Sequence, residues 1–105
     1  MIRLEDCDIN EMNAKAIMYS LYSMSNKVCG LSFSYNKFFK DECLKQLIEI
    51  LPDMKNLRIL ELSKISASDQ SIMKLIQSLT SNLPHLRTLD LSCNHLSYFT
   101  IQSLV

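Results

Sequence analysis

The chain has 105 residues, 48% of them hydrophobic, which is enough for one domain with a buried core. Its 11 Lys and Arg residues balance its 11 Asp and Glu residues, and this balance argues against a nucleic-acid or anionic-membrane partner. No stretch approaches the roughly 20 apolar residues of a membrane span, and the start, MIRLEDCDINE, lacks the basic and apolar regions of a secretory signal. We therefore expect one soluble, cytoplasmic domain comprising residues 1–105.

The first predicted element is a short strand, because IRLEDCDI from Ile2 alternates apolar and polar residues. A helix follows, since Ala14, Met18 and Leu21 recur at the i, i+4, i+7 spacing of an apolar helix face. Asn10 is the candidate cap at the start of this helix. A return segment then leads to the next strand.

The same order of elements recurs along the chain with a constant period. LSFSYNKF begins at Leu31, LELSKISA at Leu60 and LDLSCNHL at Leu89, so that successive starts are 29 residues apart. The apolar helix columns recur with the same period, at Cys43, Leu47, Ile50, Ile72, Ile76, Leu79, Ile101 and Val105. The sequence therefore predicts repeats at residues 2–30, 31–59 and 60–88, and an incomplete repeat at 89–105.

A single strand and helix cannot bury both of their apolar faces, so the repeats must stack against one another. Parallel strands then lie side by side, and the helices cover one face of the sheet. Because neighbouring helices need roughly 10 Å and neighbouring strands only about 4.8 Å, the array bends with its strands on the inner side. The predicted fold is α/β, a right-handed solenoid of about four strand-turn-helix units with parallel strands on the concave face.

The stretches LDLSCNHL at residues 89–96 and LSFSYNKF at 31–38, together with the 29-residue helical unit, resemble leucine-rich repeats of the ribonuclease-inhibitor-like subclass. The resemblance covers the whole chain. It implies a leucine-rich-repeat solenoid, and it implies a function in binding another protein.

The turns between strand and helix depart from the family pattern at one position. The family usually holds Asn or Cys there, and the matching residues in this chain are Cys7, Asn36, Ile65 and Asn94. Ile65 cannot make the hydrogen bonds of an Asn side chain, so the third turn is either more open or held by Ser63, Ser66 or Ser68. The candidate caps of the helices that follow are Asp41 for the second helix and either Ser68 or Asp69 for the third.

The sequence offers little catalytic or metal-binding chemistry. Gly30 is the only glycine, which excludes glycine-rich phosphate loops, and the four cysteines form no CxxC pair and are expected to be reduced. Cys93 with His95 is formally a thiol and a base, but no pocket is expected around them. The acidic residues within 5–8 are better explained as a solvated face than as a metal site. We therefore expect no enzyme activity, no catalytic residue, no metal or other cofactor and no small-molecule substrate.

The candidate binding surface is the concave strand face with its adjoining turns. Side chains that alternate with the core positions, and those of the turn that follows each strand, should point outward. The predicted partner-binding residues are Arg3, Glu5, Asp6, Ser32, Tyr35, Lys37, Glu61, Lys64, Asp90, Cys93 and His95. Tyr35 is the predicted anchor, because a rigid aromatic among polar neighbours is typical of protein-binding surfaces. The alternative is an aromatic that is merely exposed on a strand.

These features favour a non-enzymatic module that binds a folded protein. The resemblance to ribonuclease-inhibitor-like proteins implies a sharper form, in which binding inhibits a partner enzyme by occluding its active site. The composition, rich in Ile, Lys, Asn and Ser, is also similar to that of leucine-rich-repeat effectors of intracellular bacteria such as Legionella. That similarity implies secretion into a host cell without a cleaved signal peptide. The alternative function is structural, a fragment of a longer repeat array that stacks or oligomerises through uncapped ends.

Overall fold

The computed structural model describes residues 1–83 and 85–94. They form an α/β fold around a four-stranded parallel sheet with the order β1-β2-β3-β4. The strands are β1 (Ile2–Arg3), β2 (Gly30–Ser32), β3 (Ile59–Glu61) and β4 (Thr88–Asp90). The helices are α1 (Glu11–Ser23), α2 (Asp41–Ile50) and α3 (Asp69–Asn82). Strand and helix alternate along the described chain, which confirms the predicted α/β class with a parallel sheet.

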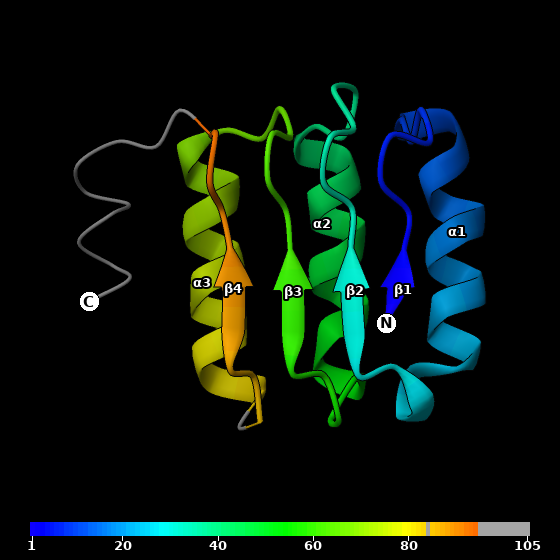
Figure 1. The fold of residues 1–105 in the computed structure, drawn as a ribbon, viewed down its shortest axis with the longest axis vertical. Helices are drawn as coiled ribbons and strands as arrows, with labels where there is room; N and C mark the ends of the chain where they lie inside the picture. The colour runs from blue at the N-terminus through cyan, green and yellow to red at the C-terminus, as the bar shows by residue number, and fades with distance from the viewer. Residues whose placement is uncertain (84, 95–105) are drawn as a thin grey trace.

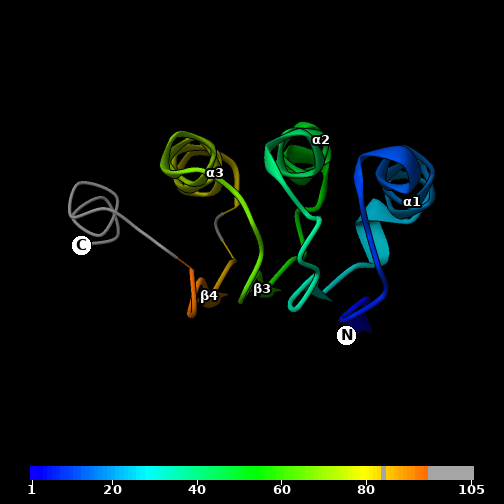
Figure 2. The same cartoon turned by 90° about the horizontal axis from the view of Figure 1, so that it is seen from above.

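The three helices form one layer along one side of the sheet (Figure 1, Figure 2). We call the other side the open sheet face. Short 3₁₀ turns, η1 (Ser25–Lys27) and η2 (Leu51–Asp53), follow α1 and α2 and lead the chain back toward the sheet. The fourth predicted helix, with Ile101 and Val105, lies outside the described residues. None of the described helices is long and apolar enough to cross a membrane.

Neighbouring strands pair in a register of 29 residues. Leu31, for example, lies beside Ile2 on one side and beside Leu60 on the other. Backbone hydrogen bonds carry the same register past the strands into the turns, as in the bond from the Tyr35 N–H to the Ser63 carbonyl (2.9 Å). Residues at equivalent positions of successive units therefore lie in rows across the sheet and across the turns that follow it.

The core fills the space between the sheet and the helix layer. Leu31 and Leu60 from the strands are fully buried, and the rings of Phe33 and Phe39 pack with their centroids 5.0 Å apart. Burying one such side chain stabilises the fold by roughly 1.5–3 kcal/mol. The predicted helix-core positions are buried at Ala14, Met18, Leu21, Cys43, Leu47, Ile72, Ile76 and Leu79. Ile50 is only partly buried.

Two of the predicted helix caps are confirmed. The Asn10 side-chain oxygen accepts hydrogen bonds from two backbone N–H groups in the first turn of α1, at 2.8 and 3.2 Å. Ser68 rather than Asp69 caps α3, and its hydroxyl oxygen accepts from the Ser71 N–H at 3.3 Å. These three bonds satisfy N–H groups that have no partner within the helix.

The prediction of Asp41 as a cap is wrong, because Asp41 is the first residue of α2 and Lys40 precedes it without a capping side-chain bond. The Asp41 carboxylate reaches instead to the next unit, where its Oδ1 accepts from the Ser68 N–H at 2.6 Å. That hydrogen bond is the main reason why the pKa of Asp41 is lowered; the Ser68 and Ser71 hydroxyls and the Lys74 charge add to it, and partial desolvation opposes it. The ionised carboxylate thus links the starts of α2 and α3.

Asn36 joins the first turn to the second from a buried position. Its Oδ1 accepts from the N–H groups of Cys7 (3.0 Å) and Ile9 (3.1 Å). Its Nδ2 donates to the carbonyls of Leu4 and Phe33, both at 2.8 Å. Only 1% of Asn36 is exposed. One carboxamide therefore supplies partners to backbone groups of two successive units where the strands end.

Asn94 serves the third turn in the same way. Its Oδ1 accepts from the Ile65 N–H (3.0 Å) and its Nδ2 donates to the Leu62 carbonyl (2.8 Å). Ile65 is itself 8% exposed and joins the core. Of the serines predicted to hold this turn, Ser66 does so across units, because its hydroxyl donates to the Lys37 carbonyl at 2.6 Å. The third turn is therefore held although it lacks an asparagine of its own.

Asn36→Ala should lower the free energy of unfolding by about 2–4 kcal/mol, because several backbone groups at a buried position would lose their hydrogen-bond partner. Urea denaturation followed by circular dichroism measures the change. Asn56→Ala is the matched control, since Asn56 is exposed and donates one bond to the Asn26 carbonyl (2.8 Å). The control should cost less than about 1 kcal/mol. Similar losses for the two variants would contradict a special role of Asn36.

Candidate interaction surface

The turns that follow the four strands share a left-handed backbone at one position. Asp6, Tyr35, Lys64 and Cys93 have φ angles of 51°, 63°, 56° and 58°. They occupy the same row of the 29-residue register, and all four are exposed. Left-handed φ is uncommon for residues other than Gly, Asn and Asp, and most unusual for a bulky side chain such as Tyr35. The same turn geometry therefore presents four chemically different side chains to solvent.

A hollow of about 500 Å³ lies at this edge of the sheet. Its lining residues are Asp6, Asp8, Tyr35, Lys37 and Lys64. Tyr35 is 54% exposed, and the turn between β2 and α2, in which it lies, rises above its neighbours at the top of Figure 1. The structure thus brings together four predicted site residues, including the aromatic anchor, and adds Asp8. We call these five residues the Tyr35 hollow.

Charge is segregated within the Tyr35 hollow. Asp6 and Asp8 come from the first turn, and Lys37 and Lys64 come from the second and third turns. The ion pairs found within residues 1–83 and 85–94 join Arg3 to acidic residues of the open sheet face, so none of them involves Asp6, Asp8 or Lys64. The Lys37 ammonium lies 5.3 Å from the centroid of the Phe38 ring, a cation–π contact. Two carboxylates and the Lys64 ammonium thus face solvent around the tyrosine without an ion pair in the described part of the chain, and the exposed Lys37 lies beside them against the Phe38 ring.

The open sheet face differs from the prediction at Ser32. Arg3 Nη1 lies 3.2 Å from Glu61 Oε1 and 3.3 Å from Glu5 Oε1. Arg3, Ser32 and Glu61 are register partners on β1, β2 and β3, so the Arg3–Glu61 pair reaches across β2. Ser32 is 0% exposed, because its short side chain lies between two long ones that meet above it. The prediction of Ser32 as a partner-binding residue is therefore wrong, because its side chain is covered, whereas Arg3, Glu5 and Glu61 remain accessible at least in part.

The last predicted residues lie on or after β4. Asp90 Oδ1 accepts from the Ser92 N–H at 2.9 Å, and hydrogen bonds from the Ser92 hydroxyl and N–H lower the pKa of Asp90 against a small opposing effect of burial. Cys93 is exposed but does not line the Tyr35 hollow. His95 lies outside the described residues, and so does any pairing of His95 with Cys93. Asp90 and Cys93 are therefore not part of the Tyr35 hollow.

An apolar pair at the start of the strands was missed by the prediction. Met1 and Ile59 are 51% and 36% exposed, and Ile59 is the register partner of Gly30. A Cβ on Gly30 would lie 2.5 Å from the Met1 sulfur, so the glycine leaves room for that side chain. The alternation continued one step back from Leu31 and Leu60 would have indicated this row.

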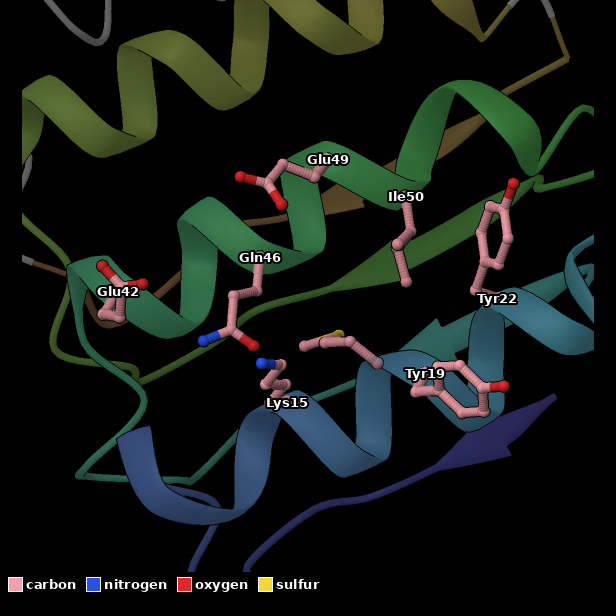
Figure 3. Close-up of a pocket in the computed structure, with 8 residues that line it drawn as sticks. Lys15, Tyr19, Tyr22, Glu42, Gln46, Glu49 and Ile50 are labelled. Carbon is pink, nitrogen blue, oxygen red and sulfur yellow. The ribbon is translucent and has the colours of Figure 1, made fainter.

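A second hollow, of about 530 Å³, lies on the helix side between α1 and α2 (Figure 3). Tyr19 and Tyr22 from α1 lie at one end of it with Ile50 from α2, and Lys15 and Gln46 point toward each other nearer the other end. Tyr19 and Tyr22 are 78% and 52% exposed. This groove could not be predicted from the repeat pattern, because both tyrosines fall outside the apolar columns of the period.

The described residues include few arrangements of side chains of the kind that metal sites and catalytic sites use. Within the described residues, no group of three or more His, Cys, Asp and Glu side chains is placed to hold a metal ion. All four cysteines are free; burial raises the pKa of the Cys43 thiol, and the other three are exposed. Comparisons of the chain with protein-family models, with curated proteins and with solved structures found no match. An assignment of function therefore has to rest on the residues of the surface itself.

Tyr35→Gly should keep the fold and raise the free energy of unfolding by up to about 1 kcal/mol, because glycine adopts a left-handed backbone without the Cβ penalty. Lys37→Gly is the matched control in the same turn, since Lys37 is exposed and is not among the residues with positive φ. The control should lose about 0.5–1 kcal/mol from the added freedom of the unfolded chain. Thermal and urea unfolding of both variants measure the difference. A loss as large in Tyr35→Gly as in Lys37→Gly would show that the ring itself stabilises the turn.

Proposed function

We propose that the chain is a non-enzymatic leucine-rich-repeat module of the ribonuclease-inhibitor-like type. It binds a folded protein through its open sheet face, the concave side of a right-handed solenoid, and through the adjoining turn edge. The 29-residue register supports the repeat interpretation, because each unit meets the next at equivalent residues. The helix layer supports the choice of face, since it covers the opposite side of the sheet (Figure 2).

The observation that carries the proposal is the Tyr35 hollow. A half-exposed aromatic ring offers a large contact area at a low cost in side-chain entropy, and charges at its rim orient a partner. On the open sheet face, Arg3 is already held by Glu5 and Glu61. A surface whose side chains are fixed before binding loses less entropy when the partner arrives.

The width of the sheet limits what can rest on it. Four strands at a spacing of roughly 4.8 Å span only about 15 Å. That width suits one projecting loop or helix of a partner, or the rim of its active site. Occlusion of a partner enzyme is therefore the specific form of the proposal, and a host-cell enzyme or signalling protein is the target if the chain acts as a bacterial effector.

Affinity capture from extracts of the native cell or of a host cell, followed by mass spectrometry, identifies the partner, and binding is then measured with purified proteins. Tyr35→Gly and Lys64→Glu should each weaken this binding about thirtyfold or more, because a hot-spot residue at the centre of an interface contributes about 2 kcal/mol or more. Lys45→Glu is the control, since Lys45 is exposed on α2 on the opposite side of the molecule. Binding that is abolished by the control and retained by the other two variants would place the site on the helices.

A second function is favoured by the outer edge of the first unit. An apolar hollow of about 350 Å³ there includes Ile2, Leu4, Ile17 and Met24 in its lining. β1 is the first strand of the sheet, so its outer edge has no strand partner within the described residues. An apolar side next to an unpaired parallel strand has the form of a surface onto which another strand-helix unit stacks. The alternative function is therefore assembly into a longer array through this edge.

Ile17→Lys tests this alternative, because a buried lysine at a stacking interface would be strongly unfavourable. If the chain assembles through the β1 edge, analytical ultracentrifugation should show concentration-dependent association that Ile17→Lys abolishes. Tyr35 does not line the hollow at the β1 edge, so Tyr35→Gly should leave the association unchanged. A monomer at every concentration of the unmodified chain would contradict the stacking function.

A further inference from the structure

The Tyr35 hollow has a fixed order of charges along the turn edge. Asp6 and Asp8 follow β1, Tyr35 follows β2 and Lys64 follows β3. Because β2 lies between β1 and β3 in the sheet, the tyrosine ring stands between an acidic side and a basic side. A ligand that crosses this edge therefore meets carboxylates at the first turn, the aromatic ring with the Lys37 side chain at the second, and the Lys64 ammonium at the third.

We propose that the Tyr35 hollow binds an arginine side chain of the partner protein, and that an acidic residue two positions along the same partner segment pairs with Lys64. This inference rests on the proposed protein-binding function and names the partner chemistry of that site. Arginine is the side chain that fits the acidic side, because its planar guanidinium can bond carboxylates with two N–H groups and also stack on an aromatic face. A lysine ammonium would offer the charge without the stacking plane.

The available charges favour this polarity over a purely anionic or purely cationic ligand. Asp6 and Asp8 make no ion pair within residues 1–83 and 85–94, so their attraction for a cation is not already used. Lys64 is likewise without an ion pair there, whereas the Lys37 ammonium lies against the Phe38 ring. A free cation would be repelled by the lysines and a free anion by the aspartates. A segment that carries both signs satisfies both sides.

The spacing of the turns sets the spacing of the two charges on the partner. The first and third turns are two strand spacings apart, or roughly 9.6 Å. Residues i and i+2 of an extended segment lie on one side and are roughly 6.6 Å apart. The long side chains of arginine and lysine cover the remaining distance. The expected recognition element is therefore an extended Arg-x-Asp or Arg-x-Glu segment laid across the turn edge.

The probe for this inference is the peptide acetyl-Arg-Ala-Asp-amide, titrated into the ¹⁵N-labelled full chain and followed by two-dimensional NMR. Its amide shifts should be concentrated at residues 6–8, 35 and 64. The matched peptide with citrulline in place of arginine has nearly the same shape without the charge, and it should bind at least about threefold more weakly. The peptide acetyl-Arg-Ala-Asn-amide tests the acidic half, and it too should bind more weakly.

Two variants connect these differences to the named side chains. The double variant Asp6→Asn with Asp8→Asn removes both charges and keeps residues that tolerate the left-handed φ of 51° and 53° found at these positions. It should abolish the preference for arginine over citrulline. Lys64→Asn should abolish the preference for Asp over Asn in the peptide. Equal binding of the arginine and citrulline peptides, or shifts confined to the groove of Tyr19 and Tyr22, would overturn the proposal.

The outcome of this titration can be separated from that of the proposed function. If no peptide binds but Tyr35→Gly still loses the captured protein partner, the arginine inference fails and the protein-binding function stands. If the arginine preference is found while Tyr35→Gly and Lys64→Glu leave partner binding unchanged, the proposed function of this surface fails and the partner role of the arginine site fails with it.

Discussion

Pairing between strands that lie 29 residues apart is the constraint on which the rest of the structure depends. A strand of two or three residues makes few ladder bonds by itself, so each unit is stable only beside neighbours in register. The register then places equivalent turn residues side by side, with the Asn36 carboxamide holding the first two turns together. The Tyr35 hollow, whose lining comes from three successive turns, is a product of this stacking and not of any one loop.

The 29-residue period predicts the alternation of strands and helices and the parallel sheet, because it indicates which residues are buried. Columns such as that of Leu31 and Leu60 are apolar in every unit, and a row that is always apolar has to face the core. Hydrogen bonds between residues close in sequence can also be predicted, as at the helix caps Asn10 and Ser68. The exposure of Tyr35 could also be predicted, because this residue follows the buried strand positions in a polar stretch.

Contacts between units determine what the period cannot predict. Ser32 alternates like an outward residue, yet it is buried because Arg3 and Glu61, from the strands on either side, are long enough to meet across it. Asp41 has the residue type of a cap, but its carboxylate accepts from the backbone of Ser68 in the next unit. Both outcomes depend on side-chain length and direction between strands or helices, which a one-dimensional pattern does not contain. The left-handed backbone that shapes the hollow could not be predicted either, because none of the residues that adopt it is a glycine.

The side chains in the row of left-handed residues are not explained by the stability of the fold. Its four positions hold an Asp, a Tyr, a Lys and a Cys at φ angles between 51° and 63°, although glycine would adopt this backbone at a lower cost. Burial does not explain the choice of side chain either, since all four residues are exposed. A tyrosine in the left-handed region costs of order 1–2 kcal/mol, and at 54% exposure the fold regains little of it. Such a residue is expected where the ring makes its main contact outside the chain. For that reason Tyr35, and not the covered Ser32 or the ion-paired Arg3, is the centre of the proposed interaction surface.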